Sequence, residues 1–348
     1  MTVPITLLAH WYRFVTLLVR RLRLRNPWNY KAPLLIAFTY LTVAVCDVAA
    51  STALIGTLAA LGTIAGIAGI AYFLNDLGDV RQDLAVGKDN AVAGMSLTQR
   101  AMTLTGFLAL ALLPWTVLPL TRDAALLLGI EFALFVLYSM PPFRLKERGW
   151  LGLVADALYA HALPAVLAMI TFAAMAPPLP SNANPTLEAL LATVFAWQLA
   201  LGLRNIVLHQ LLDHGNDVAG GNRTLAVSLG PTALSAVLAR VLVPLEALSF
   251  GAFALVAAPQ FPWLLPAFGL HAVLATLRVR KLGLPQPRTL REALFVYADN
   301  FYADWLPLLF LVVLLNQAPG YWPLAVLHLL VFRNGLRQTW RDLLGSGH

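Results

Sequence analysis

Residues 53–83 read ALIGTLAALGTIAGIAGIAYFLNDLGDVRQD, an apolar stretch that ends in a cluster of acidic residues. The rest of the 348-residue chain avoids charge: only 12% of its residues are charged, 59% are hydrophobic, and the mean hydropathy is +0.73. This composition is typical of a protein that lies in a lipid bilayer, where ionisable side chains are costly and usually functional. The sequence therefore predicts membrane helices and draws attention to the acidic residues that follow them.

The hydropathy pattern predicts an all-α, polytopic membrane bundle. A chain of this length holds roughly nine or ten membrane helices of about 20–25 residues each. The predicted spans are 33–50, 53–75, 98–119, 122–141, 151–176, 187–211, 232–258, 261–280 and 293–316. A shorter apolar piece at 321–332 is either a tenth span or a re-entrant segment, because it is too short for a simple crossing.

No polar linker divides the chain, so residues 1–348 are expected to form one transmembrane domain. Residues 1–30 are rich in Arg and Trp and are predicted to lie on the membrane surface as an amphipathic segment, and residues 317–348 are predicted to form a membrane-associated tail. The first residues resemble neither a cleavable signal nor a transit peptide, which favours a bacterial inner membrane. Because Cys46 is the single cysteine, an internal disulfide and a cysteine-built metal site are excluded.

The distribution of basic residues predicts the orientation of the chain. Of the 24 Lys and Arg residues, 22 lie before the first span, in alternate loops, or after the last apolar piece. The positive-inside rule places the N-terminus and these loops in the cytoplasm, and both acidic clusters fall on this side. Orientation thus explains the net charge of +7 better than nucleic-acid binding does.

Five aspartates form two clusters, and they are predicted to be catalytic residues and metal ligands. The first cluster is Asp76, Asp79 and Asp83, and the second is Asp213 and Asp217. On helices, these spacings put the members of each cluster on one face, where like charges repel and a cation removes the penalty. Hard oxygen ligands favour Mg²⁺, which is typically held by one or two carboxylates together with substrate phosphates.

Basic residues near the clusters fit a phosphate-binding role, because Arg can grip a phosphate with two hydrogen bonds and Lys acts as a point charge. The candidates are Arg81, Lys88, Arg144, Lys146, Arg204 and Arg223. The alternative for each is an anchor at the cytoplasmic membrane surface. Both interpretations stay open for Arg144 and Lys146, whereas Arg148 is expected to be an anchor.

Three motifs in this order resemble the UbiA superfamily of intramembrane prenyltransferases. The first is NDLGDVRQD at 75–83, the second is DHGNDVAGGNRT at 213–224, and the third is the loop YSMPPFRLKERG at 138–149. They follow the second, sixth and fourth predicted spans on one membrane side, so the resemblance covers most of the chain. The segment 87–94, GKDNAVAG, departs from the family's Arg-rich run, and the resemblance therefore does not identify the acceptor.

The resemblance implies a bundle of nine membrane helices around a central cavity, with a cytoplasmic cap over a metal site. It also implies an allylic isoprenyl diphosphate as donor. By position, Asn75 joins the five aspartates in binding Mg²⁺ and diphosphate, Arg144 and Lys146 touch the phosphates, and Tyr138 lies near the reacting carbon.

Two further polar residues are candidates for substrate binding. His209 lies four residues before Asp213 on the same helical face, where it either binds an acceptor, acts as a base, or only hydrogen-bonds a carboxylate. Asp156 lies inside the fifth span, and its burial there is costly unless it faces a cavity.

The favoured function is a membrane prenyltransferase in which Mg²⁺ and basic side chains assist the departure of diphosphate while an acceptor attacks the allylic carbon. The same site could transfer phosphoribose to a polyprenyl phosphate, or cyclise an isoprenoid without an acceptor. A transporter is disfavoured, because the acidic residues lie at helix ends rather than near the bilayer midplane. The expected partners are an isoprenyl diphosphate, an unidentified acceptor and the lipid bilayer, with no nucleic acid.

Overall fold

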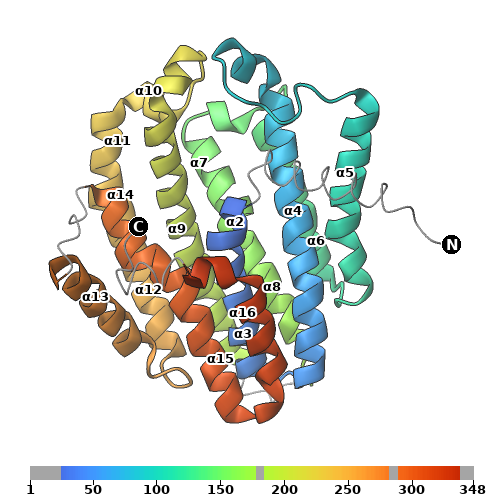
Figure 1. Ribbon diagram of the computed structural model, residues 1–348, viewed down its shortest axis with the longest axis vertical. Coiled ribbons are helices and arrows are strands. Elements are labelled where there is room, and N and C mark those ends of the chain that lie inside the picture. Colours follow the sequence, from blue (N-terminus) through green and yellow to red (C-terminus); the bar gives the residue numbers. More distant parts are fainter. Residues whose placement is uncertain (1–24, 178–183, 282–288, 338–348) are drawn as a thin grey trace.

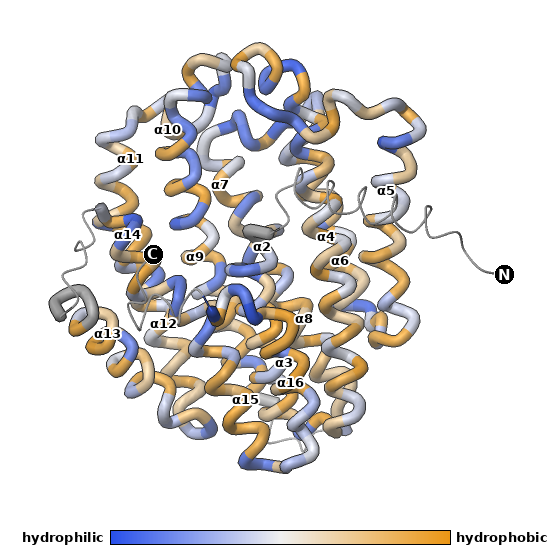
Figure 2. Tube along the Cα trace, viewed as in Figure 1, coloured by the Kyte–Doolittle hydropathy of each residue, from blue (hydrophilic) through white to orange (hydrophobic). Residues whose placement is uncertain are grey.

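The computed structural model describes residues 25–177, 184–281 and 289–337, and within these ranges it contains helices and loops but no β-strand. The long helices run roughly parallel (Figure 1), and hydrophobic residues cover most of their length (Figure 2). The predicted all-α membrane bundle is thereby confirmed. Residues 1–24 of the predicted surface segment and residues 338–348 of the predicted tail lie outside the described ranges.

Helices occupy all nine predicted spans. The first six spans correspond to α3 (Ala32–Cys46), α4 (Ala50–Ala85), α5 (Leu97–Leu112), α6 (Arg122–Ser139), the run α7–η3–α8 (Trp150–Ala157, Leu158–Ala162, Leu163–Ala173) and α9 (Asn184–Ala219). The last three correspond to α11–η4–α12 (Pro231–Val237, Leu238–Leu242, Val243–Ala257), α13 (Leu264–Lys281) and α14–η5–η6–α15 (Leu290–Leu294, Phe295–Asp299, Phe301–Trp305, Leu306–Gln317). The other elements are α2 (Arg25–Tyr30), η1 (Leu113–Thr116), η2 (Leu145–Glu147), α10 (Leu225–Leu229), η7 (Pro319–Tyr321) and α16 (Trp322–Val331).

Within the described residues, six helical stretches are long and apolar enough to cross a membrane. They are Trp28–Cys46, Ala50–Ala85, Trp150–Ala173, Thr186–Ala219, Pro231–Ala257 and Leu290–Gln317. α5 has 16 residues and is followed by a 3₁₀ turn that contains Pro114, and α6 carries Arg122, Asp123 and Glu131. The count of nine membrane helices therefore stays a prediction, and α16, with 10 residues, is shorter than a crossing helix.

α4 and α9 are matching helices of 36 residues each. A helix of this length extends about 54 Å, which exceeds the roughly 30 Å hydrocarbon core of a bilayer. Asp79 and Asp213 each lie six residues before the end of their helix, and Asp83 and Asp217 each lie two residues before it. The two acidic clusters thus occupy equivalent positions at the upper end of the bundle, where hydrophilic residues gather (Figures 1 and 2).

α3 lies in the interior of the bundle and packs against α8 and α15. Its sequence is apolar on every face, as expected of a helix that neighbours enclose, and 13 of its 15 residues are buried. The ring of Phe38 on α3 lies 5.7 Å from that of Trp197 on α9, and Trp197 in turn stacks on Phe253 of α12 at 5.1 Å. This aromatic cluster fixes α9, and with it the second acidic cluster, against the core.

A small residue on α4 allows α5 to approach closely. A Cβ atom at Gly66 would lie only 2.3 Å from the backbone nitrogen of Ala111. Small residues have this role in membrane bundles because van der Waals contact between backbones drives helix association there. The close contact fixes the position of α4, which carries the first acidic cluster.

Candidate active site

One aspartate of each acidic cluster lines a shared cavity of about 400 Å³, a volume in the usual range for small-molecule sites, whereas Asp76, Asp79 and Asp217 are not among its lining residues. Asn75 and Asp83 of α4 line it, together with Tyr138 of α6 and Asp213 of α9. Asp83 and Asp213 are 130 residues apart in the sequence. The fold therefore brings together the helix ends that the aspartate spacing marked as candidates.

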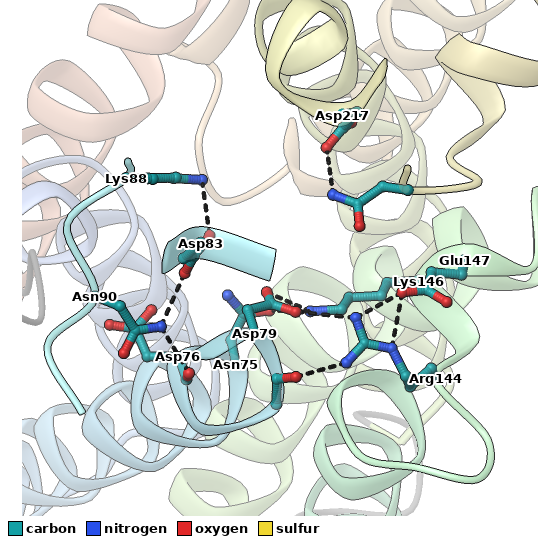
Figure 3. A network of polar contacts seen from close by, with 12 residues as sticks. Asn75, Asp76, Asp79, Asp83, Lys88, Asn90, Arg144, Lys146, Glu147 and Asp217 are labelled. Atoms are coloured by element: carbon teal, nitrogen blue, oxygen red, sulfur yellow. Dashed lines mark hydrogen bonds and ion pairs between the residues drawn. The ribbon is translucent and has the colours of Figure 1, made fainter. Parts of the chain in front are cut away.

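The loop after α6 holds the carboxylate of Asp79 (Figure 3). Nζ of Lys146 donates to both oxygens of Asp79, and it also donates to Oδ1 of Asn75 at 3.1 Å. Arg144 donates from Nη2 to Oδ1 of Asp79 at 3.0 Å and from Nη1 to the carbonyl oxygen of Gly78 at 2.7 Å, while its Nε donates to Glu147 at 2.7 Å. Two predicted phosphate ligands and three residues of the first motif thus form one network.

The surroundings shift the pKa values of both basic residues of this loop. Burial lowers the pKa of Lys146, and the Asp79 carboxylate offsets only part of this effect. Burial also lowers the pKa of Arg144, but Glu147 and Asp79 together outweigh burial and raise it. Arg144 is therefore a fixed positive charge, whereas the charge of Lys146 is costly in its present surroundings and an anionic ligand stabilises it.

Asn90 holds the other two aspartates of the first cluster, a role that the sequence did not suggest. Its Nδ2 donates to Oδ2 of Asp83 and to the carbonyl oxygen of Asp76, each at 2.8 Å. The backbone nitrogen of Ala91 donates to Oδ2 of Asp76 at 3.2 Å, and Nζ of Lys88 lies 3.9 Å from Asp83. The segment 87–94, which departs from the family pattern, therefore folds back onto the acidic cluster.

The second cluster divides into a held carboxylate and one that faces the cavity. Asn222 and Thr224 donate to the two oxygens of Asp217 at 3.0 and 3.1 Å. Both residues belong to the second motif, so its conformation fixes Asp217 next to the turn that ends α9. Asp213, one turn earlier on the same face, lines the cavity.

Aromatic and polar side chains form the wall beside the carboxylates. The rings of Tyr138 and Tyr159 meet edge to face with centroids 5.2 Å apart, and the hydroxyl of Tyr159 donates to Asp156 at 2.7 Å. All three residues line the cavity, as does His209. The predicted position of Asp156 toward a cavity is therefore what the structure shows.

Three of the predicted phosphate ligands lie elsewhere. Arg81 and Arg223 are exposed and do not line this cavity. The fully buried guanidinium of Arg204 donates to Glu246 of α12 at 2.7 and 3.0 Å and to Asp299 of η5 at 2.6 and 3.0 Å. Arg204 and Asp213 are nine residues apart on α9, which corresponds to about two and a half helical turns. Their side chains therefore point to opposite sides of the helix.

Two ionisable residues of the cavity wall were not singled out by the sequence. Lys31, which precedes α3, lines the cavity. Glu131 of α6 also lines the cavity and is 1% exposed, and neither of its carboxylate oxygens has a hydrogen-bond partner within the described ranges. The presence of Glu131 in an apolar span is a signal that could have marked it.

The cavity presents side-chain oxygen atoms that could bind a metal ion. Among the residues that the structure describes, no group of three or more His, Cys, Asp or Glu side chains is close enough to hold a metal ion. Asn75, Asp83 and Asp213 nevertheless present amide and carboxylate oxygens to one space. Mg²⁺ commonly takes one or two carboxylates and completes its octahedron with water and phosphate oxygens. The donor set therefore fits Mg²⁺ that binds together with a diphosphate.

Comparisons with known proteins agree with this geometry. The sequence model of the UbiA prenyltransferase family matches residues 34–302. The fold is similar to that of a UbiA homolog from Archaeoglobus fulgidus bound to GPP and Mg²⁺, with a TM-score of 0.55 and 17% identity over 85% of this chain and 99% of that chain. The DMAPP- and Mg²⁺-bound structure of a UbiA homolog from the same organism gives a TM-score of 0.56 and 16% identity over 85% and 98%. No curated protein matches the chain.

Proposed function

Because the chain belongs to the UbiA prenyltransferase family, we propose that it is an integral-membrane enzyme that transfers an isoprenyl group from an allylic isoprenyl diphosphate to an acceptor. The observation that carries the proposal is that Asp83 and Asp213, from the two acidic clusters, line one cavity with Asn75. Two similar structures of a UbiA homolog from Archaeoglobus fulgidus are bound to GPP or DMAPP together with Mg²⁺, which supports the same class of donor here.

The polar end of the cavity suits a diphosphate. Asp83 and Asp213 supply carboxylates for Mg²⁺, and Lys88 and Lys31 line the same space as positive charges. Asp76, Asp79 and Asp217 are held by hydrogen bonds outside the lining of the cavity, and they would serve as further metal ligands if donor binding released these contacts. Arg144 and Lys146 approach from the loop after α6 and would bind the phosphate oxygens.

The remainder of the cavity suits an isoprenyl chain. Residues of α4 line it from Ala60 to Asp83, a separation that corresponds to about 35 Å along the helix axis. Away from the carboxylates the wall is mainly apolar, with Ile67, Phe135 and Leu167 among its residues. A hydrocarbon tail can therefore lie in this part of the cavity while its diphosphate remains at the polar end.

In the proposed reaction Mg²⁺, when bound, neutralises the diphosphate as its bond to the allylic carbon breaks. The basic side chains of the loop hold the phosphate oxygens, and the apolar walls exclude the water that would quench a cationic carbon. The rings of Tyr138 and Tyr159 lie beside the polar end, where aromatic faces stabilise a developing positive charge.

The orientation and location of the protein follow from the sequence and are part of the proposal. We place the acidic clusters, the loop after α6 and the N-terminus in the cytoplasm because basic residues gather on this side. The whole chain is taken as one membrane domain, and the bacterial inner membrane is the proposed location.

The test uses protein purified into lipid nanodiscs and labelled donors. Asp76→Ala and Asp213→Ala should each abolish Mg²⁺-dependent diphosphate release from GPP, whereas Asp123→Ala, at the other end of α6, should not. Unchanged turnover in the first two variants contradicts the assignment. Phosphoribosyl diphosphate as the accepted donor, or a cyclic product formed from GPP alone, replaces prenyl transfer with one of the other two reactions.

A further inference from the structure

A second cavity of about 920 Å³ lies beside α9. Residues of α9, η4, α14, η5 and η6 line it, together with the start of α3. Lys31, Tyr72 and His209 line both cavities, so the two spaces adjoin at the polar end of the bundle. A molecule in the second cavity would therefore be next to the diphosphate end of a donor in the first.

All four π-helical turns of the described residues contribute to the wall of this second cavity. His161 lies on η3, Leu238 on η4, Asp299 on η5 and Tyr302 on η6. A π-turn inserts one residue into an α-helix, which costs hydrogen-bond geometry and occurs frequently at functional sites. Packing defects would be scattered over the bundle, whereas these four turns surround one space.

The inner part of the second cavity contains side chains whose hydrogen-bonding groups have no partner. Gln198 of α9 is 1% exposed and His161 is 4% exposed. Within the described ranges, Nε2 of Gln198 and Nε2 of His161 have no hydrogen-bond partner. Leaving a buried polar group unpaired is costly, so these atoms indicate a ligand that supplies the missing hydrogen bonds.

The wall of the second cavity carries charges of both signs: Lys31 and Arg291 are positive, and Glu292 and Asp299 are negative. Leu201 and Leu208 provide apolar surface in the same wall. Because these charges balance beside apolar surface, the wall suits a neutral ligand that combines an apolar body with a hydroxyl group.

We propose that the second cavity is the acceptor site of the enzyme and that it takes a neutral molecule with a hydroxyl group on an apolar body. The hydroxyl hydrogen-bonds Gln198 and His161, and the apolar body packs against the leucines. This inference rests on the proposed transferase function, and it identifies the class of acceptor, which the family resemblance leaves open.

The test measures saturable binding of three fluorescent probes to the protein in nanodiscs, relative to empty nanodiscs. The probes are 2-naphthol, naphthalene and 2-naphthoate, which share one ring system. The wild-type protein should bind 2-naphthol about 10- to 100-fold more tightly than naphthalene, as expected for two well-placed hydrogen bonds, and more tightly than 2-naphthoate. Gln198→Leu should reduce the preference for 2-naphthol over naphthalene about 3- to 10-fold, because one of the two hydrogen bonds is lost. Thr193→Val, on α9 but outside both cavities, should retain the full preference.

Two further measurements distinguish a failure of this inference from a failure of the proposed transferase function. Ser235→Trp places a large ring at an exposed position of the second cavity and should abolish saturable binding of 2-naphthol without requiring a buried substitution. Binding of 2-naphthol that persists in Ser235→Trp, is unchanged in Gln198→Leu, or is competed away by GPP with Mg²⁺ overturns the second-cavity site. Diphosphate release from GPP by the wild-type protein, measured in parallel, shows whether the transferase function itself stands.

Discussion

Nζ of Lys146 contacts both carboxylate oxygens of Asp79, and this ion pair joins the loop after α6 to the end of α4. In the proposed reaction Asp79 is a metal ligand and Lys146 is a phosphate ligand. The two residues therefore hold each other in place before the donor binds. Donor binding would free Lys146 to contact the phosphate oxygens and Asp79 to hold the metal ion.

Replacing Lys146 by Met should raise KM for GPP about 10- to 100-fold, because a hydrogen bond to a charged group contributes about 1.5–3 kcal/mol. Lys146→Arg should restore part of the affinity, since it keeps the charge. The measurement is steady-state diphosphate release in nanodiscs, with Arg122→Met at the other end of α6 as the control. A lower KM in Lys146→Met would show instead that Lys146 competes with the metal for Asp79.

Gly78 sets the distance between α4 and α6 beside the site. A Cβ atom there would lie 2.4 Å from the carbonyl oxygen of Ser139, and the carbonyl oxygen of Gly78 accepts a hydrogen bond from Arg144. Gly78→Ala should lower kcat about 10- to 100-fold, because a displacement of about 1 Å can misalign reacting groups to this extent.

The control for Gly78→Ala is Gly129→Ala on α6, where no described atom lies within 4 Å of the added carbon. This variant should gain about 0.5–1 kcal/mol of stability, since Ala favours helix over Gly, and should keep its activity. Equal kcat values for Gly78→Ala and Gly129→Ala would mean that the contact between α4 and α6 does not position the site.

Arg204 is predicted to act in folding, in contrast to the phosphate-binding role that its place in the sequence suggested. Arg204→Leu leaves Glu246 and Asp299 without their counter-ion and should lower the free energy of unfolding by about 3–5 kcal/mol. KM for GPP of the folded fraction should stay unchanged. The measurements are thermal unfolding and steady-state kinetics on the same preparation. Unchanged stability with a raised KM would restore the phosphate-ligand interpretation.

The Glu131 side chain should destabilise the wild-type protein, because neither of its carboxylate oxygens has a hydrogen-bond partner among the described residues. Replacing it with Leu, which matches Leu128 and Phe135 on the same helical face, should raise the free energy of unfolding by about 1–3 kcal/mol. Glu188→Leu, at an exposed position of α9, should change stability by less than about 0.5 kcal/mol. A loss of stability in Glu131→Leu would indicate that the carboxyl group has a stabilising partner.

The acidic clusters could be predicted because their information is local. The helical period alone puts Asp76, Asp79 and Asp83 on one face, and the end of the apolar run places them at a membrane surface. The motif order then predicted that the two acidic clusters would converge, and Asp83 and Asp213 do line one cavity. The loop residues Arg144 and Lys146 could be anticipated for the same reason, since they belong to a continuous motif.

Other features depend on contacts that a single sequence does not contain. Glu246 and Asp299, the partners of Arg204, lie 42 and 95 residues further along the chain, so nearness to Asp213 in sequence was misleading. Asn90 reaches Asp83 only because the segment after α4 folds back. No residue type in the sequence marks the π-turns around the second cavity, because these turns arise from packing.

The most direct measurement of the central claim is a double-mutant cycle on Asp83 and Asp213, read as Mg²⁺-dependent turnover of GPP. If both carboxylates serve one metal-bound diphosphate, Asp83→Asn and Asp213→Asn should each lower kcat/KM strongly, and the double variant should be little worse than either single variant. Losses that multiply in the double variant, or full turnover in either single variant, would contradict the account.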